Sequence, residues 1–354
     1  MNWFQRLLHR PFFIRLFNWE YWSFNTIYIP IYIVWIGLCV RAKSFFFFAA
    51  SNPRIKNGGF LNESKKEICL LIPPEIHPKT LFFSVPSNAD VVLAELKKND
   101  LQFPLIGKPD IGGRGRGIKA LGNETDVKEY LKLAFLDFHI QEFVSYKNEV
   151  GIFYYRYPDK PSGNISGIVR KEFLKVTGDG TSTVKTLLLK DKRAILQLQN
   201  LEKTNPGLLL TILAEGEERI IVPYGNHARG AKFLDDSHLI TEELTTTIDR
   251  ICKTIPDFYF GRLDIRFNTW EELIKGLKFS VIEVNGAGSE PTHIYDPRHT
   301  IFFAWKEIIR HWVILWRISR INHRLGFPYL TVKEGVQMFR EDKLNSQKLA
   351  AMQV

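Results

Sequence analysis

The sequence predicts an α+β fold, in which helices and strands are mixed, and three observations predict it. Short apolar segments typical of strands recur along the chain, at 103–109, 138–155, 261–266 and 280–286. Elsewhere, apolar residues recur at the spacing of one helix face, as in Leu244, Ile248, Ile251 and Ile255. With 354 residues, 45% of them apolar, the chain is long enough to fill a sizeable core.

Composition excludes several classes of protein. The three cysteines are scattered and have no partner motif, so neither a disulfide framework nor a zinc site is predicted, and a reducing compartment fits. No internal repeat indicates a solenoid. The formal charge of +10 is concentrated in two flanks, because residues 1–61 carry +6, residues 298–324 carry +5 and the rest carries −1. Since the central body is neutral and shows no nucleic-acid motif, no nucleic-acid partner is predicted.

Residues 1–61 are expected to associate with a membrane. A charge-free run extends from Tyr21 to Val40, which is borderline for a bilayer span, and it contains Pro30. Aromatic residues such as Trp19 and Trp22 are typical of headgroup depth. We expect a monotopic or re-entrant anchor, and a cleaved signal peptide is not expected. The alternative is a buried helix pair formed with residues 45–48.

A short lead-in at 62–100 precedes the first set of functional candidates, with a strand expected near Ile68–Ile72 and a helix at Ala89–Lys98. Residues 103–109 predict a strand that ends near Lys108. A glycine-rich loop follows, and a helix is expected at 124–135. Because glycines let backbone amides close over phosphate oxygens, this loop is predicted to cover a triphosphate. Its spacing fits neither a Walker A loop nor a dinucleotide-binding loop. The glycines are Gly112, Gly113, Gly115 and Gly117.

Residues 138–155 predict a strand, a turn and a second strand, with Glu142 and Glu149 on either side of the turn. Further on, the Asp-Gly turn within 177–181 is followed by a helix start at Thr183. One of Lys171 and Lys175 is expected to face the site, and strand alternation does not decide which. The loop at 225–231 could close over an acceptor substrate or be a plain surface loop.

The most informative stretch is Gly261–Arg266 followed by 280–286. In a strand, alternate side chains share a face, so Arg262 lies beside Asp264, and Glu283 lies beside Asn285. If the two strands pair, three oxygen donors and one guanidinium converge. Hard oxygen ligands of this kind suit Mg²⁺.

Residues 300–324 predict a helix with a narrow basic stripe and an apolar opposite side. The same pattern describes either a helix on a membrane surface or a core-packed helix with a solvated face. Together with the N-terminal flank, it makes an anionic lipid surface the expected partner. The stripe consists of Lys306, Arg310, Arg317, Arg320 and Arg324, and the opposite side of Ala304, Ile308, Trp312 and Leu315.

The order of these motifs over residues 87–297 resembles the ATP-grasp superfamily. The motifs are Lys-Pro with a glycine loop, Gln-Glu-Phe-Val with a second glutamate seven residues later, Gly-Arg-x-Asp, and Glu-x-Asn. The nearest likeness is to D-alanine:D-alanine ligase and related carboxylate–amine ligases. The Gly-Asp-Gly segment at 178–180 is similar to that of cyanophycin-synthetase-like members.

The resemblance implies roles for individual residues. Lys108 would contact the nucleotide phosphates, and Arg262 would steady an acyl phosphate and the tetrahedral species after it. ATP and one or two Mg²⁺ ions, or Mn²⁺, are the implied cofactors, and Asn226 and Arg229 belong to the possible substrate loop. The implied nucleotide-binding residues also include the four loop glycines, the hinge Gln141, Glu142, Phe143 and Val144, the ribose-binding Glu149, and Lys175; the implied metal ligands are Asp264, Glu283 and Asn285.

The resemblance also implies an architecture of two α+β lobes that clamp the nucleotide. We expect a membrane-associating segment at 1–61, a lead-in at 62–100, a nucleotide lobe at 101–161, a metal and substrate lobe at 162–297, and a helical segment at 298–354. D-alanine:D-alanine ligases carry a full α/β domain before the nucleotide lobe, and here only about 40 residues intervene. The first substrate is therefore left open.

The resulting hypothesis is an ATP- and Mg²⁺-dependent ligase that joins a carboxylate to an amine at the cytoplasmic face of the membrane. Its substrates would be small molecules or peptides, and its oligomeric state is left open. Taken singly, Lys108, Glu149 or the Arg262–Asp264 pair could be an ordinary surface charge. Two alternatives at the level of function are a non-catalytic ATP sensor and a membrane-surface interaction protein.

Overall fold

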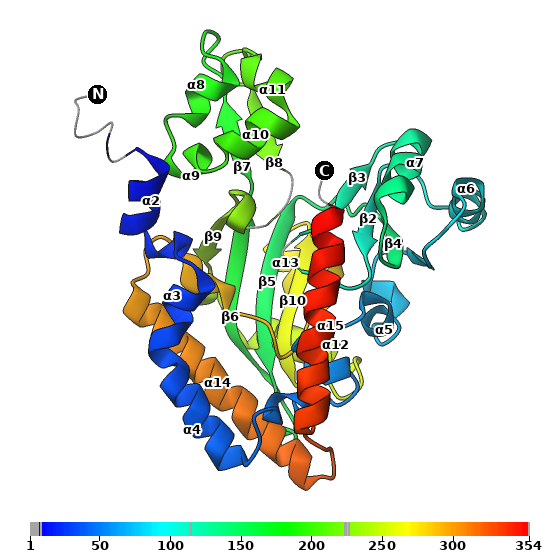
Figure 1. Cartoon of the computed structure of the whole chain (residues 1–354), viewed down its shortest axis with the longest axis vertical. Coiled ribbons are helices and arrows are strands. Elements are labelled where there is room, and N and C mark those ends of the chain that lie inside the picture. Colours follow the sequence, from blue (N-terminus) through cyan, green and yellow to red (C-terminus); the bar gives the residue numbers. More distant parts are fainter. Residues whose placement is uncertain (1–6, 8, 114, 223–224, 226, 353–354) are drawn as a thin grey trace. The chain divides into compact units, whose positions relative to one another are not determined.

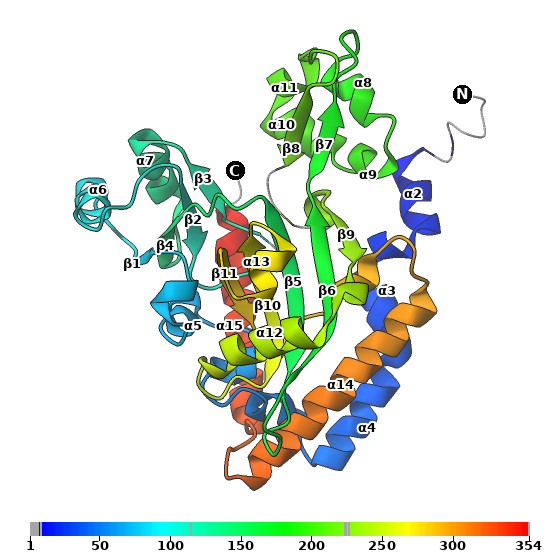
Figure 2. The same ribbon diagram turned by 180° about the vertical axis from the view of Figure 1, so that it is seen from behind.

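The computed structural model describes residues 7, 9–113, 115–222, 225 and 227–352. The chain separates into two compact units, each assembled from distant stretches of sequence. The first unit comprises Met1–Tyr32, Val169–Asp235 and Thr292–Glu307. The second comprises Ile33–Ile168, Asp236–Pro291 and Ile308–Val354. Both contain helices and antiparallel strands, so the predicted α+β fold is confirmed (Figures 1 and 2).

A four-stranded antiparallel sheet forms one part of the second unit. Its order is β1 (Thr80–Phe83), β4 (Phe138–Glu142), β2 (Leu105–Pro109) and β3 (Lys119–Leu121). Helices α6 (Ala89–Lys98) and α7 (Glu124–Leu133) pack on it, and the side chains of Asn88 and Asn123 cap their first turns. Both helices and the strands β2 and β4 were predicted, although α7 ends two residues earlier than expected, whereas β1 and β3 were not predicted.

A second sheet in the same unit carries β11 (Phe279–Asn285), β10 (Phe260–Phe267), β5 (Asn148–Tyr155) and β6 (Asn164–Glu172), in that order. Helix α12 (Glu242–Lys253) forms where the helical spacing of apolar residues predicted one, and it begins after its cap Thr241. Its apolar face packs with α13 (Trp270–Ile274) against alternate residues of β5 and β10. This face of the sheet is therefore fully covered.

The opposite face of β5 and β10 packs against helices from both ends of the chain. Phe153 and Phe260 contact α4 (Tyr32–Ala42), α14 (Ile301–Arg324) and residues 46–48 in one apolar cluster. Helices α4 and α14 run side by side there (Figures 1 and 2). The predicted apolar side of α14 is buried at Ala304, Ile308 and Leu315.

One expected element is wrong. Instead of a strand near Ile68–Ile72, the chain forms helix α5 (Lys65–Cys69) and a turn. The Ser64 side chain accepts a hydrogen bond from the backbone N–H of Glu67 and thereby caps this helix. Ile68 and Ile72 lie four residues apart and both enter the core, so an apolar run that resembled a strand follows helical spacing.

The segment predicted to associate with a membrane is partly core. Phe46, Phe47 and Phe48 are buried, and the Trp35, Leu38 and Cys39 side of α4 packs on the same cluster. The stretch Phe24–Ala42 is long and apolar enough to cross a membrane by length and composition alone. It contains α3 (Phe24–Tyr28), the 3₁₀ turn η2 (Ile29–Ile31) and α4.

The first unit contains a two-stranded sheet of β7 (Leu174–Thr177) and β8 (Glu218–Val222). Four short helices surround it, and β6 continues into this unit, where it pairs with β9 (Lys232–Asp235). Near the N-terminus, buried Glu20 forms an ion pair with Arg193. The helices are α8 (Val184–Leu188), α9 (Lys192–Ile195), α10 (Leu198–Thr204) and α11 (Pro206–Leu210), and the N-terminal elements are α2 (Pro11–Phe17) and η1 (Trp19–Tyr21).

The chain ends in α15 (Val332–Ala351), which starts with a reciprocal capping box between Thr331 and Glu334. Its last residues, Leu349 and Met352, are buried in the core of the four-stranded sheet. The C-terminal segment is thus helical, as predicted, and its end packs beside the glycine-rich loop.

Candidate functional site

Strands β10 and β11 bring the four key side chains together. Asp264 lies directly opposite Glu283, and Arg262 lies directly opposite Asn285. Because alternate side chains share a face, all four project from one side of this strand pair. The strand pairing that the sequence analysis required is therefore present, and an irregularity in the register follows immediately after Asp264.

The charges in this group are closely coupled. The Arg262 Nε donates to Asp264 Oδ1 at 2.9 Å, and the guanidinium also reaches Oδ2 at 3.4 Å. Burial lowers the pKa of Arg262, but the carboxylates of Asp264 and Glu283 outweigh it, and the net shift is upward. Asp264 is buried, and the neighbouring Arg262 guanidinium compensates the charge of its carboxylate.

The donor set fits a magnesium ion. Two carboxylates directly opposite each other on paired strands repel, so a cation between them is favourable. Among the described residues, the buried Asn285 Nδ2 atom has no hydrogen-bond partner, so no contact of that nitrogen opposes an orientation in which the amide oxygen faces a metal ion. Within the described residues no three Asp, Glu, His or Cys side chains cluster as metal ligands. Two carboxylates and one amide oxygen would occupy part of the coordination shell of Mg²⁺ and leave its other coordination positions to water and substrate phosphates.

Lys108 lies on the neighbouring sheet, on β2, and its charge reaches the same group. Its Nζ donates to Gln141 Oε1 at 2.7 Å. Burial lowers the pKa of Lys108, while the carboxylates of Glu283 and Glu149 act in the opposite direction. Residues about 175 positions apart in sequence therefore interact electrostatically in one unit.

Two histidines near Lys108 are held neutral. Burial and the charge of Lys108 lower the pKa of His77 to about 4 and that of His139 well below its ordinary value. His139 lies opposite Lys108 on the paired strand β4. The two imidazoles therefore add no positive charge beside Lys108 at neutral pH.

Two residues of the lead-in were not predicted. The Lys65 Nζ donates to the carbonyl oxygen of Gly112 at 2.6 Å. Among the described residues, the buried Glu63 Oε2 has no hydrogen-bond partner. Burial raises the pKa of Glu63 to about 7. The charges of Lys65 and Arg262 oppose this rise, and that of Glu283 adds to it. No local pattern marks Glu63, because its charged neighbours include Arg262 and Glu283, which lie about 200 positions later in the sequence.

The glycine-rich loop is anchored at both of its ends. Asp110 accepts hydrogen bonds from the Ser64 hydroxyl and the Lys66 backbone N–H. Gly117 has a φ of +70°, and a Cβ there would lie 3.0 Å from Pro109. Gly113, by contrast, is exposed with open space around it. Arg114 lies outside the described residues.

The predicted hinge joins the two sheets. The Gln141 side chain is buried and also bonds Thr80 Oγ1 at 3.0 Å, while Glu142 and Phe143 are exposed. Glu149, predicted to bind ribose, pairs with Arg266 at 3.3 Å. Arg266 also donates to the Val144 carbonyl oxygen at 3.2 Å, so it fixes the hinge. This arginine was missed because it requires the register of β5 and β10, which pairs it with Glu149.

The remaining predicted residues belong to the first unit. Lys175 is exposed on β7 and pairs with Glu218 at 2.8 Å. Lys171 lies on β6, and the choice between the two lysines stays open. Arg229 lies in the 3₁₀ turn η6 (His227–Arg229), and Asn226 lies outside the described residues. The roles of all the site residues remain predictions.

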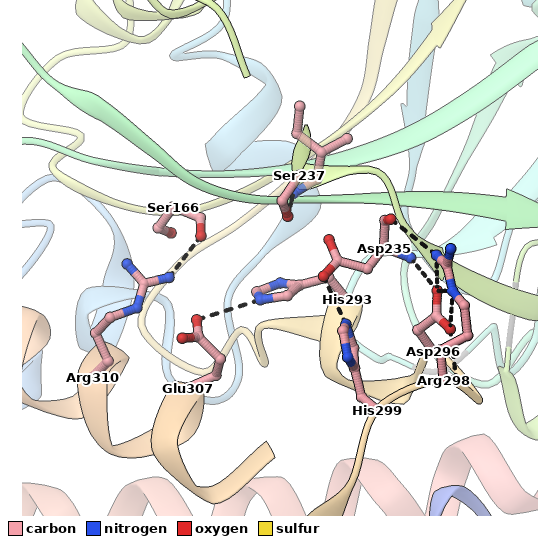
Figure 3. A network of polar contacts seen from close by, with 10 residues as sticks. Ser166, Asp235, Ser237, His293, Asp296, Arg298, His299, Glu307 and Arg310 are labelled. Carbon is pink, nitrogen blue, oxygen red and sulfur yellow. Dashed lines mark hydrogen bonds and ion pairs between the residues drawn. The ribbon is translucent and has the colours of Figure 1, made fainter. Parts of the chain in front are cut away.

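The first unit also contains a polar cluster that was not predicted (Figure 3). Asp296 is fully buried; burial opposes its ionisation, but hydrogen bonds from Arg298 and from the Asp235 backbone N–H outweigh this and lower its pKa. His299 Nε2 lies 2.7 Å from Asp235 Oδ2, and His293 Nε2 lies 3.4 Å from Glu307 Oε2. These contacts tie the segment after β11 to β9.

No family model and no curated protein matches the sequence. Similar solved structures include a D-alanine–D-alanine ligase from Bacillus anthracis, at 14% identity over 74% of this chain and 69% of that chain, with a TM-score of 0.41. A bifunctional glutathione synthetase from Pasteurella multocida matches at 15% identity over 70% of this chain and 35% of that chain, with a TM-score of 0.35.

An ATP-grasp ligase complexed with a minimal precursor matches at 14% identity over 64% of this chain and 52% of that chain, with a TM-score of 0.34. The chain therefore spans less than two thirds of the length of two of these three proteins. At these identities and TM-scores, the matches say only which solved structures the chain is similar to.

Proposed function

We propose that the protein is an ATP- and Mg²⁺-dependent ligase that joins a carboxylate to an amine. The observation that carries the proposal is the convergence, in one unit, of Asp264, Glu283 and Asn285 with Arg262, within electrostatic reach of Lys108. A group of two carboxylates, an arginine and a lysine, of which Asp264 is buried and the others half-buried, suits a divalent cation and a polyphosphate better than a surface ion pair does.

In this proposal each residue has a defined task. Asp264, Glu283 and Asn285 would hold Mg²⁺, which neutralises phosphate charge when bound. Lys108 would bind the β- and γ-phosphates, and the amides of the loop at 112–117 would close over them. The adenine would sit at the hinge, where Phe143 is exposed and Arg266 fixes the backbone.

The reaction would proceed in two displacements. A carboxylate oxygen of the first substrate attacks the γ-phosphorus, and the bond to ADP breaks to give an acyl phosphate. The amine then attacks the acyl carbon, and inorganic phosphate leaves with the C–O bond electrons as the amine loses its proton. Arg262 would stabilise the oxyanion of the tetrahedral species. Positioning and electrostatics carry such chemistry, so no side-chain nucleophile is required.

The substrates are proposed only by class, as a small-molecule or peptide carboxylate and an amine. The lead-in supplies Glu63 and Lys65 beside the site, where related ligases carry a larger domain. We place the reaction at the cytoplasmic face of a membrane, in keeping with the basic and aromatic flanks of the sequence.

A hydroxylamine trap tests this function. The full chain is incubated with Mg-ATP, hydroxylamine and a panel of carboxylic acids, and hydroxamate and ADP are quantified. We expect acid-dependent hydroxamate from one acid class, reduced about 100-fold or more in Asp264→Asn and in Glu283→Gln. Glu129→Gln is the matched control, because Glu129 is an exposed acid paired with Lys119.

Nucleotide binding without hydroxamate from any acid would contradict the ligase and favour a non-catalytic ATP sensor. Equal hydroxamate yields from wild type, Asp264→Asn and Glu283→Gln would show that these two side chains do not hold a metal ion needed for the reaction.

A further inference from the structure

A cavity of about 290 Å³ lies in the second unit, at the C-terminal part of α14. The indole of Trp316 and the ring of Tyr157 form its apolar wall. Ile321, four basic residues and a single acid, Asp159, line the rest. The basic residues are Lys160, Arg317, Arg320 and Arg324.

A fifth cation joins this basic pocket from α4. The guanidinium of Arg41 lies 4.8 Å from the centroid of the Trp316 ring, and that of Arg320 lies 4.7 Å from the same ring. Trp316 is itself buried, so its ring is a fixed platform between the two. Stacking on an aromatic face orients a guanidinium without using its hydrogen-bond donors.

The positive charge of this pocket exceeds the single negative charge of Asp159. Across the part of the chain that the structure describes, none of these five side chains forms an ion pair with a carboxylate, whereas most other ion pairs link one lysine or arginine to one acid. Five cations gathered around one acid repel one another. Such a pocket is complementary to an anion, and arginines on a rigid platform match the oxygens of a phosphate group.

The outer face of α4 adds an apolar surface beside this pocket. Ile33, Ile36 and Val40 are spaced by three and four residues and are 74%, 52% and 71% exposed. They lie on the side opposite Leu38 and Cys39, which pack in the core. Phe45, which follows the helix, is 67% exposed. A contiguous apolar stripe next to an excess of cations is typical of a helix that lies in a membrane interface.

We propose that the basic pocket binds the phosphate headgroup of an anionic phospholipid while the Ile33–Val40 face of α4 enters the headgroup and acyl boundary. The chain would then rest on the membrane surface, because the inner side of α4 is already covered by protein. Arg41 connects the two features, since it follows the apolar stripe and reaches the pocket wall. This proposal does not depend on the ligase activity.

Sedimentation with vesicles tests it, using the full chain and either pure phosphatidylcholine or phosphatidylcholine with 30% phosphatidylglycerol. The pocket variant is Lys160→Gln, Arg317→Gln and Arg324→Gln. Its matched control removes three exposed lysines of the same unit, Lys97→Gln, Lys128→Gln and Lys132→Gln. Circular dichroism and the melting temperature verify that each variant is folded. A third variant, Ile33→Gln with Val40→Gln, tests the apolar face.

We expect wild type and control to bind the anionic vesicles about tenfold or more tightly than the neutral ones. The pocket variant should lose about tenfold or more of that affinity, since each basic residue near an anionic surface contributes about fivefold. The apolar-face variant should lose affinity for both vesicle types.

Equal binding by the pocket variant and the control would overturn the proposal, as would equal binding to neutral and anionic vesicles. A third result would also overturn it: wild type does not bind the vesicles but binds inorganic phosphate or a short oligonucleotide in calorimetry, and the pocket variant loses that binding. That outcome would make the pocket a site for a soluble anion or a nucleic acid.

Discussion

At the scale of single residues, Glu63 shows how the site sets the properties of a buried charge. Burial is the largest cause of its raised pKa of about 7, compared with 4.5 in a solvated chain. Between these two values the folded state binds more protons than the unfolded state. The free energy of unfolding therefore decreases as the pH rises through this window.

The substitution Glu63→Gln removes this titration while keeping the shape of the side chain. At pH 8 we expect it to increase the free energy of unfolding by on the order of 2 kcal/mol, because an unpartnered buried carboxylate becomes a neutral amide. Near pH 4.5 the expected change is small. Urea unfolding of wild type and variant at pH 8 and pH 4.5 measures the two free energies. A variant that is less stable than wild type at pH 8, or changed equally at both pH values, would contradict the prediction.

At the scale of elements, the glycine-rich loop depends on backbone conformation at particular positions. Gly117 adopts a left-handed φ, and an added Cβ would press on Pro109, whereas Gly113 has open space around it. The sequence marks all of these glycines equally, so their unequal roles come only from the packing of the loop.

We expect Gly117→Ala to destabilise the chain by about 1 to 2 kcal/mol and to weaken binding of an ATP analogue, because the new methyl group strains the loop. Gly113→Ala is the matched substitution and should leave both properties nearly unchanged. Denaturant unfolding and fluorescence titration measure the two effects. Equal losses of stability and binding in both variants would contradict the prediction that the two glycines have different roles.

Local patterns predicted those elements whose signal lies in neighbouring residues. The cap and apolar spacing of α12, and the alternation in β10 and β11, are local signals. The strand expected at Ile68–Ile72 failed because a short apolar run fits both periods, and the cap at Ser64 decided for a helix.

The candidate site was predictable only in part. Asp264, Glu283 and Asn285 were found because each lies in a motif on one strand. Lys65, Glu63 and Arg266 were missed because their contacts require tertiary packing or strand register, which no local pattern contains. The basic side chains of α14 were predicted as one narrow stripe that faces either a membrane surface or solvent. In the structure Arg310 donates to the Ser166 carbonyl oxygen at 2.7 Å, and Arg320 stacks on Trp316.

At the scale of the whole chain, the N-terminal segment and the candidate site depend on each other. Asn52 is fully buried, and its Nδ2 donates to the carbonyl oxygens of Gly58 and Phe260 at 2.9 and 2.8 Å. Its Oδ1 accepts from the backbone N–H groups of Tyr259 and Phe260. One side chain thus connects the loop after residue 50 to the start of β10, the strand that carries Arg262 and Asp264.

Asn52→Ala should therefore destabilise the chain strongly, by about 3 kcal/mol, since it leaves several buried backbone groups unpaired. Asn99→Ala is the control, because that amide lies at an exposed helix end and bonds only to Glu95. Thermal unfolding compares the two.

Removal of residues 1–61 should likewise prevent folding of the second unit. A stable remainder that still binds nucleotide would contradict this prediction.

The central claim is that Lys108 and the Asp264–Glu283–Asn285 group bind one magnesium–nucleotide complex. Isothermal calorimetry with a non-hydrolysable ATP analogue, with and without Mg²⁺, tests it most directly. We predict that wild type binds more tightly with Mg²⁺, that Asp264→Asn with Glu283→Gln abolishes this dependence, and that Lys108→Met weakens binding about tenfold. Mg²⁺-dependent binding of equal strength in all three proteins would contradict the claim.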